Sequence, residues 1–395
     1  MQIAPRLSAL AAVAILASQG VAEDYVNVQM LYYDEKDETT TVVSPAVELN
    51  LDLGVDYTLN AKVGMDALTG ASETYYDKSY QPGSGASPYK HALSKPSAYA
   101  RGKVITQQDV GYGPVDYRDY RYSGSVALTR RLANRDELTG TLSYNNEYDY
   151  HIPEAGVGYK HWLDEHRNSS IEASVAYQMA WVLIWCRDND YCDTNSGASE
   201  IFYQHNTFAQ MRYRQVIDRR SKGGLTLFYN HESGFLSNPY KNIVRDYDTA
   251  PRITNERRPD KRDGYGFKVD YECAVSASDT LQGSYRYYHD DWHLDAHTIE
   301  GRIYHAYSSR LRLDGMLRYY RQSAAWFYHG GRDYFTDEAY ASSDIRLGKM
   351  HSWFAQGGLV YRVDGKLSQN FYLNYYRQDN GLHAVSFIVG EKYRF

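Results

Sequence analysis

Six imidazole and carboxylate side chains are concentrated in the nine-residue segment HDDWHLDAH, residues 289–297. They are His289, Asp290, Asp291, His293, Asp295 and His297. Imidazole nitrogens and carboxylate oxygens are ligands that suit Zn²⁺, Mn²⁺ or Fe²⁺. Because residues two apart in a strand share a face, His293, Asp295 and His297 can converge on one ion. A tight solvated turn contains the same residue types, so the segment is either a metal site or a polar hairpin.

A second candidate is the segment WCRDNDYCDTN, which contains Cys186 and Cys192. Two cysteines six positions apart can join a loop in an oxidising compartment, so we expect a disulfide between them. Asp188 and Asp190 offer oxygen ligands for Ca²⁺, but the glycine and terminal glutamate of an EF-hand are missing. A solvated acidic loop is the alternative. Cys273 lies among apolar residues in FKVDYECAVS, and we expect it to be a small apolar side chain that faces lipid.

Enzyme motifs are missing from the sequence. It contains no GxSxG, no phosphate-binding Walker loop, no HExxH and no haem-attaching CxxCH. We therefore expect no enzymatic activity and no cofactor, with a surface enzyme of dispersed residues kept as an alternative.

The first residues indicate export of the chain. Arg6 precedes an apolar run from Leu7 to Ala17, and the small residues Gly20 and Ala22 follow at the spacing of a signal-peptidase site. We therefore predict a signal peptide at residues 1–22 and one β-barrel domain at residues 23–395. The chain has 41 Tyr and 6 Trp, which collect where membrane meets water. Its net charge of −6, with both signs mixed, excludes a polybasic nucleic-acid binder.

Alternating apolar and polar residues recur in segments of about ten residues, as expected for a transmembrane β-barrel. The alternation predicts an all-β fold: a single antiparallel barrel of about 16 strands. The expected strands are 24–34, 39–53, 56–69, 117–130, 136–149, 152–163, 169–185, 202–217, 222–235, 263–276, 280–291, 297–308, 311–324, 350–363, 367–378 and 383–395.

The last segment places Val385, Phe387, Val389, Tyr393 and Phe395 on one face. A terminal aromatic residue preceded by another at two positions resembles the signal that the outer-membrane assembly machinery reads. We therefore expect Tyr393 and Phe395 to be that signal, the assembly machinery and membrane lipid to be partners, and the bacterial outer membrane to be the location.

The connections between segments fall into two classes. Short polar turns would lie in the periplasm, and the long connections 70–116, 186–201, 236–262 and 325–349 would all be extracellular. The segment 70–116 is long enough to fold inward as a plug or to lie over the mouth.

The alternation predicts that many charged side chains point into the lumen. The candidates are Glu48, Lys62, Asp66, Arg121, Glu147, Arg214, Asp270, Arg286, Arg302, Arg318, Arg362 and Arg394. Opposite charges across a pore would filter solutes by their charge. The same charges can instead be paired filling in a blocked barrel.

Several segments resemble a family of outer-membrane barrels catalogued as domain of unknown function 3570. The most similar are SPAVELNLDLGVDYTLNAKVGMDALTGAS, GFLSNPYK with NERRPDKRDGYGF, SYRYYHDDWHLDAHTIEGRIYHAY with RYYRQSAAWFYH, and YASSDIRLG. The resemblance implies a barrel without an agreed activity. Family members encoded near lipoprotein and thioredoxin-like genes imply a lipoprotein or redox partner.

The leading hypothesis from the sequence is a channel for small polar solutes or ions, since a barrel of this size can enclose an aqueous lumen. The alternatives are a scaffold that docks a periplasmic or surface partner, and a surface metal-binding protein or enzyme.

Overall fold

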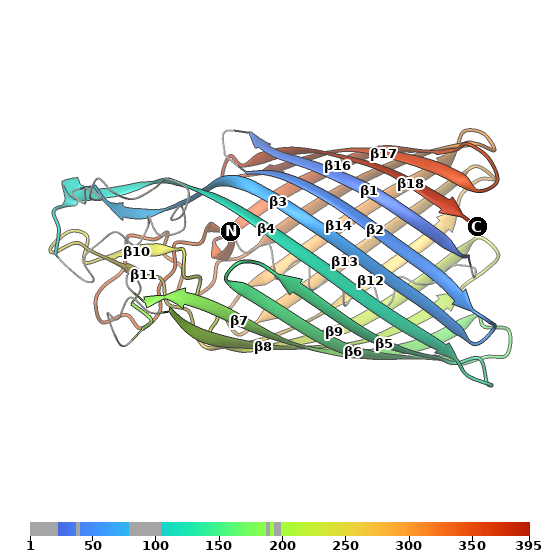
Figure 1. Ribbon diagram of the computed structural model, residues 1–395, viewed down its shortest axis with the longest axis horizontal. Coiled ribbons are helices and arrows are strands. Elements are labelled where there is room, and N and C mark those ends of the chain that lie inside the picture. Colours follow the sequence, from blue (N-terminus) through green and yellow to red (C-terminus); the bar gives the residue numbers. More distant parts are fainter. Residues whose placement is uncertain (1–22, 37–39, 79–103, 187–189, 193–198) are drawn as a thin grey trace.

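A computed structural model of the protein describes residues 23–36, 40–78, 104–186, 190–192 and 199–395. Figure 1 shows a barrel with short turns at one end and long connections at the other. The predicted signal peptide, residues 1–22, lies outside the described residues. Among the described residues, no helix is long and apolar enough to cross a membrane.

Sixteen antiparallel strands form one closed barrel, which confirms the predicted fold class and strand number. They are β1 (Tyr25–Lys36), β2 (Thr41–Leu53), β3 (Tyr57–Asp77), β4 (Val110–Arg131), β5 (Glu137–Asn146), β6 (Tyr150–Trp162), β7 (Ser169–Trp185), β8 (Ser199–Val216), β9 (Ser221–Gly234), β12 (Lys261–Ala274), β13 (Asp279–Asp290), β14 (Asp295–Ala306), β15 (Leu311–Gln322), β16 (Met350–Arg362), β17 (Leu367–Gln378) and β18 (His383–Arg394). Each pairs with its neighbours along the chain, and β1 pairs with β18 to close the wall.

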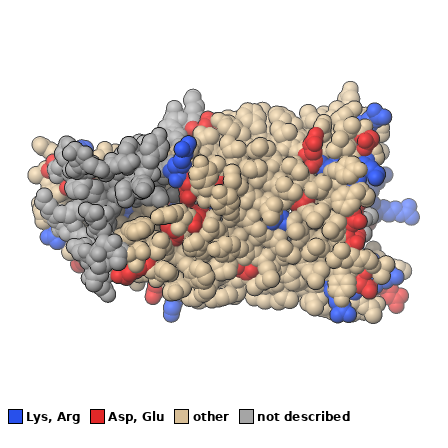
Figure 2. Space-filling model, in the orientation of Figure 1, with Lys and Arg blue, Asp and Glu red and all other residues tan. Residues whose placement is uncertain are grey.

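Two opposite faces follow from the strict alternation of side chains along each strand. The outward face carries exposed apolar residues, such as Val28, Val63, Leu142 and Ile299. Figure 2 shows the resulting band, which has few charged atoms and lies between two charged ends of the molecule. Inward residues are mostly polar or charged, so the barrel is not held together by an apolar core.

Aromatic residues border this apolar band on the outward face. Tyr144, Tyr177 and Trp353 are exposed toward the long-connection end, and Tyr159 and Tyr393 toward the short-turn end. Two such bands are the arrangement of a barrel whose ends lie at membrane interfaces.

The long connections contain more regular structure than the alternation predicted. Strands β3 and β4 continue to Asp77 and from Val110, so much of the expected loop 70–116 is an extension of the wall. The remainder, 79–103, with the predicted plug, lies outside the described residues. The connection 236–262 contains a separate hairpin, β10 (Asn242–Arg245) and β11 (Arg252–Asn255), which the sequence did not predict. Its two strands have four residues each, which is too short for an alternation to be recognised.

Residues 236–260 and 323–349 pack together at the long-connection end, and we call them the cap. Its apolar cores are made by side chains that are almost fully buried, including Ile243, Val244, Phe327 and Tyr334. Figure 1 shows β10 and β11 between the extended ends of β3–β4 and of β7–β8. Hydrogen bonds from Asn242 to the Thr74 hydroxyl and the Tyr75 carbonyl, at 2.8 and 3.0 Å, attach the cap to β3. Residues 236–260 and 323–349 therefore form one packed body at the long-connection end, attached to β3.

Candidate functional site

The inward face of the barrel is divided into an acidic wall and a basic wall. Strand register and alternation place eight acidic residues and four basic residues on the inner face of β1–β7. They are Glu35, Glu48, Asp52, Asp66, Asp119, Glu137, Glu154 and Glu172, with Lys62, Arg121, Arg131 and Lys160.

The remaining barrel strands, β8, β9 and β12–β18, have the opposite balance, with twelve basic and seven acidic residues on their inner face. They are Arg212, Arg214, Lys222, Arg262, Lys268, Arg286, Arg302, Arg312, Arg318, Arg362, Lys392 and Arg394, with Glu200, Glu232, Asp270, Glu272, Asp290, Glu300 and Asp314. The two walls face each other across the barrel axis, so the charges produce a field across the lumen.

Many of these inward charges are accessible to solvent. The side chain of Arg302 in β14 is 37% exposed and that of Lys222 in β9 is 46% exposed, although both point into the barrel. Side chains that filled the interior would bury one another. The lumen at these positions is therefore open to solvent.

Most of the described lumen charges are held by a neighbour of opposite sign. Arg302 Nε lies 2.8 Å from Glu300 Oε1, Arg212 Nη2 lies 3.2 Å from Asp270 Oδ1, and Lys222 Nζ lies 2.8 Å from Glu272 Oε1. The inward residues expected from the sequence occupy the inner face as predicted. Glu147 does so from the turn after β5, where it lies 2.8 Å from Arg121 Nε.

Three acidic residues meet on the acidic wall near the long-connection end. Ligand atoms of Asp119, Glu147 and Asp149 lie within 4.8 Å of one another. Burial, with Glu147 and Asp119 nearby, raises the pKa of Asp149, in the turn between β5 and β6, to about 7. The Arg121 guanidinium already supplies a cation to this cluster, so the acidic residues form a charge network of the wall.

Within the cap, a charged network is almost completely buried. Arg258 lies between two carboxylates, with Nε 2.5 Å from Glu256 Oε1 and Nη2 2.8 Å from Asp344 Oδ2. The Asn238 amide donates to Glu256 at 2.8 Å, and Arg346 Nε donates to Asp344 at 2.8 Å. Burial raises the pKa of Glu256, whereas Arg346 and Arg258 outweigh burial and hold the pKa of Asp344 well below its usual range. This network joins Glu256 and Arg258 to Asp344 and Arg346 within the cap, and the two carboxylates have almost no contact with solvent.

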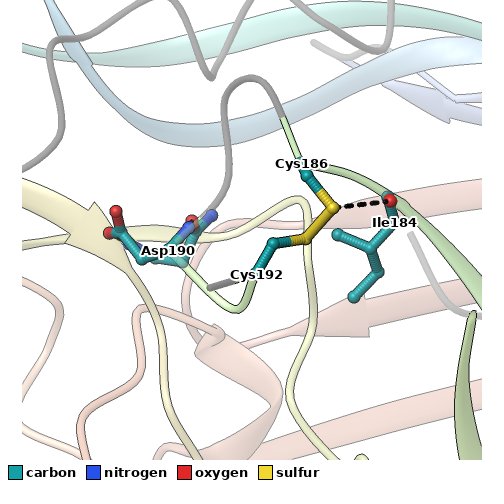
Figure 3. The surroundings of a disulfide bond; sticks show 5 residues. Ile184, Cys186, Asp190 and Cys192 are labelled. Atoms are coloured by element: carbon teal, nitrogen blue, oxygen red, sulfur yellow. Dashed lines mark hydrogen bonds between the residues drawn. A yellow bond between two sulfur atoms is a disulfide. The ribbon is translucent and has the colours of Figure 1, made fainter. Parts of the chain in front are cut away.

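Figure 3 shows the disulfide between Cys186 and Cys192, the pairing expected from the sequence. Both cysteines are buried with Ile184 and Val182 of β7. Asp190, inside the disulfide loop, exchanges two hydrogen bonds with Asn255 of β11, at 2.8 and 3.1 Å, and the Tyr191 hydroxyl donates to the Glu256 carbonyl. The disulfide loop thus fastens the cap hairpin to β7. Asp188 lies outside the described residues, and Asp190 is engaged with the hairpin.

The structure separates the polar residues of HDDWHLDAH. Asp290 points inward and pairs with Arg262 Nη2 at 2.6 Å. On the outward face, Asp295 Oδ1 lies 2.9 Å from His289 Nδ1, and His297 Nδ1 lies 2.8 Å from the Tyr285 hydroxyl. His293 is in the turn with a φ of 65°. Among the described residues, the histidines and aspartates of this hairpin do not bring three ligand atoms within 4.8 Å, so the geometry gives its metal hypothesis no support.

The two residues of the expected assembly signal lie on the outward face of the strand that closes the barrel. Tyr393 and Phe395 are exposed, and their ring centroids are 6.4 Å apart. Cys273 is a free thiol, and the alternation of β12 places it on the outward face, as the sequence indicated.

Lys268 in β12 was missing from the inward residues expected from the sequence. The alternation that places Asp270 inward also places Lys268 inward, so the signal was present in FKVDYE. The register adds that Lys268 lies directly opposite Arg286 of β13, which no local pattern reveals.

Comparison with solved structures finds barrels of low sequence identity. The ferric enterobactin receptor of Pseudomonas aeruginosa is 11% identical, with 91% of this chain and 54% of that chain covered and a TM-score of 0.45. A bacterial polysaccharide outer membrane secretin is 9% identical, with 95% and 100% covered and a TM-score of 0.48. The CymD monoaromatic hydrocarbon channel is 8% identical, with 95% and 90% covered and a TM-score of 0.43. The chain thus spans about half the length of the enterobactin receptor.

No curated protein matches the chain. One family model does match, and it extends over residues 6–392, almost the whole sequence. This match confirms the resemblance found in the sequence: the chain belongs to the family described as protein of unknown function (DUF3570).

Proposed function

We propose that the protein is a channel of the bacterial outer membrane that passes small polar or charged solutes and catalyses no reaction. The closed wall leaves no unpaired strand edge, and the outward apolar band ends in aromatic residues on both sides. These are the features that a barrel needs in lipid, where every backbone amide must be paired within the wall.

The observation that carries the proposal is the division of an accessible lumen into an acidic and a basic wall. Solvated charges of opposite sign on facing walls orient polar solutes and select ions by charge. Lys62 in β3 and Arg286 in β13 lie farther from the short-turn end and are also exposed inside the barrel, which favours an open lumen over a filled one.

The cap lies at the extracellular mouth, so solutes would have to pass beside it or move part of it. The disulfide loop holds the cap hairpin through Asp190 and Tyr191, which makes the Cys186–Cys192 disulfide the natural point at which to loosen it.

The test is conductance of the purified protein in a planar lipid bilayer, with the disulfide oxidised and then reduced. We expect discrete conductance steps and a selectivity that depends on the acidic wall. The double variant Glu48→Gln/Glu137→Gln should move the reversal potential in a salt gradient toward anion selectivity. Glu391→Gln, which removes one carboxylate from the outward face of β18, is the control and should leave the reversal potential unchanged.

A barrel that conducts in neither redox state would contradict the channel proposal. If the non-conducting protein were recovered from membranes with a stoichiometric lipoprotein or redox partner, a docking role would replace the channel proposal. The proposal also implies lipid and the assembly machinery as partners, and depletion of that machinery should remove the protein from outer-membrane fractions.

A further inference from the structure

We infer that Lys268, Arg286 and Phe228 form a binding station for small oxyanions, carboxylate or phosphate, on the basic wall of the lumen. This inference deepens the proposed function, because it names the class of solute that the lumen recognises.

Two residues of positive charge occupy directly opposite positions on neighbouring strands at this point. Lys268 of β12 and Arg286 of β13 are directly opposite in the register, and both belong to the inward set of their strands. Cβ atoms of such a pair are about 4.5–5.5 Å apart, and like charges at this distance destabilise a sheet. A pair that costs stability is expected where it serves binding.

Neither charge has a carboxylate partner among the residues that the structure describes. Neighbouring inward cations differ in this respect: Arg262 is bound by Asp290 at 2.6 Å, Arg212 by Asp270 at 3.2 Å and Arg302 by Glu300 at 2.8 Å. On a wall where cations are usually paired, an unpaired couple leaves its N–H groups directed at the solution.

The guanidinium of Arg286 is held in place by an aromatic ring and not by an anion. Its central carbon lies 4.5 Å from the ring centroid of Phe228, in β9. Phe228 is buried, while Arg286 is exposed to the lumen. Contact with the ring leaves the guanidinium N–H edge available for the two oxygens of a carboxylate or phosphate.

Gly266 makes the position of Phe228 possible. It lies opposite Phe228 in the register between β9 and β12, and a Cβ at Gly266 would be 2.6 Å from Phe228 Cζ and 2.1 Å from the Tyr287 carbonyl oxygen. A side chain at this position would push the ring away from the wall. The space left by Gly266 in β12 thus lets the Phe228 ring of β9 reach the Arg286 guanidinium of β13.

An oxyanion is the ligand that this arrangement fits. Arg286 supplies parallel donors for two oxygens, and Lys268 supplies a compact ammonium charge from the opposite position on the neighbouring strand. Carboxylate and phosphate share this chemistry, and separate titrations with acetate and inorganic phosphate distinguish them.

The station is tested first without any channel activity. Detergent-solubilised full-length protein is titrated with inorganic phosphate and, separately, with acetate, and binding is measured by isothermal titration calorimetry at low salt. We expect saturable binding of at least one anion, weakened tenfold or more by Lys268→Gln/Arg286→Gln. The control Lys222→Gln/Arg302→Gln removes the same formal charge from cations that have carboxylate partners, and should change the affinity less than twofold.

Phe228→Leu tests the role of the ring as a positioning residue, since it keeps both charges. Anion affinity should fall severalfold in this variant while the unfolding transition of the barrel is retained. Equal losses in both double variants, or saturable binding of neither anion, would overturn the station.

The same variants in a bilayer separate this inference from the channel proposal. In a conducting barrel, the anion that binds should block chloride current at saturating concentration, and the block should disappear in Lys268→Gln/Arg286→Gln only. Binding that depends on these two residues in a barrel that does not conduct would uphold the station and reject the channel. A barrel that conducts, but in which both double variants bind anions equally well, would uphold the channel and reject the station.

Discussion

Two arginines that both point toward the inside of the molecule have opposite surroundings. Arg258 in the cap is buried between Glu256 and Asp344, whereas Arg286 in the lumen is exposed and lies on the Phe228 ring with no carboxylate partner among the described residues. A buried cation needs anions within reach because desolvation is costly. A solvated cation needs none and remains available to a solute. The comparison distinguishes charge that maintains the fold from charge that can bind.

The largest effect is expected from removing the buried arginine. Arg258→Met leaves Glu256 and Asp344 buried without their shared cation, which should destabilise the cap by about 3–5 kcal/mol. Hydrogen exchange of the backbone amides at 238–258 should accelerate strongly, while the barrel strands stay protected. Arg302→Met in the lumen is the control, because Glu300 remains solvated, and should cost less than about 1 kcal/mol. Unchanged protection of the cap in Arg258→Met would show that the buried arginine does not maintain the fold of the cap.

Removal of the disulfide that fastens the cap is expected to destabilise the cap by a smaller amount. Cys186→Ser/Cys192→Ser should lower the free energy of cap opening by about 2 kcal/mol, because closing so short a loop removes only a modest chain entropy. The measurement is hydrogen exchange at Asn255 and Glu256, the residues that the disulfide loop contacts. Cys273→Ser, which removes a free thiol on the outward face, is the control and should leave this exchange unchanged. The same faster exchange in the control would show that the disulfide is not what holds the hairpin.

The smallest expected effect is a gain in the stability of the barrel, where the two variants above lose stability. Lys268→Gln should stabilise the barrel by about 0.2–1 kcal/mol, since it removes repulsion between directly opposed like charges. Denaturant unfolding in detergent should show the gain at low salt and lose most of it at about 1 M salt, where the Debye length is about 3 Å. Lys222→Gln loses its pairing with Glu272 and should bring no gain. If both variants lowered stability alike, Lys268 would be a structural residue like its neighbours.

Much of the barrel could be predicted because strand alternation is a local property. Residues two positions apart in a strand lie on the same face of the sheet, independently of distant parts of the chain. The alternation therefore identified the sixteen strands, the inward position of Arg286 and Arg302, and the outward position of Tyr393. The same local pattern also places Lys268 inward, since it lies in the same inward row as Asp270.

The cap could not be predicted, because its contacts join residues far apart in the chain. Asn242 bonds to Thr74, Asn255 to Asp190, and Arg258 to Asp344. The hairpin β10–β11 is too short for an alternation to be recognised, and its burial depends on neighbours supplied by β3 and by residues 323–349.

The sequence by itself determined the barrel, its strand number, the end at which the long connections lie and the polarity of each face, since all of these depend on the two-residue period and on segment length. Only the tertiary structure decided which inward charges neutralise one another. Pairing depends on the register between strands and on the distance between side-chain ends. For this reason Arg258, Arg302 and Arg286 look alike in the sequence. Yet the first is buried in an ion network, the second is paired in solvent, and the third lies on the Phe228 ring with no carboxylate partner among the described residues.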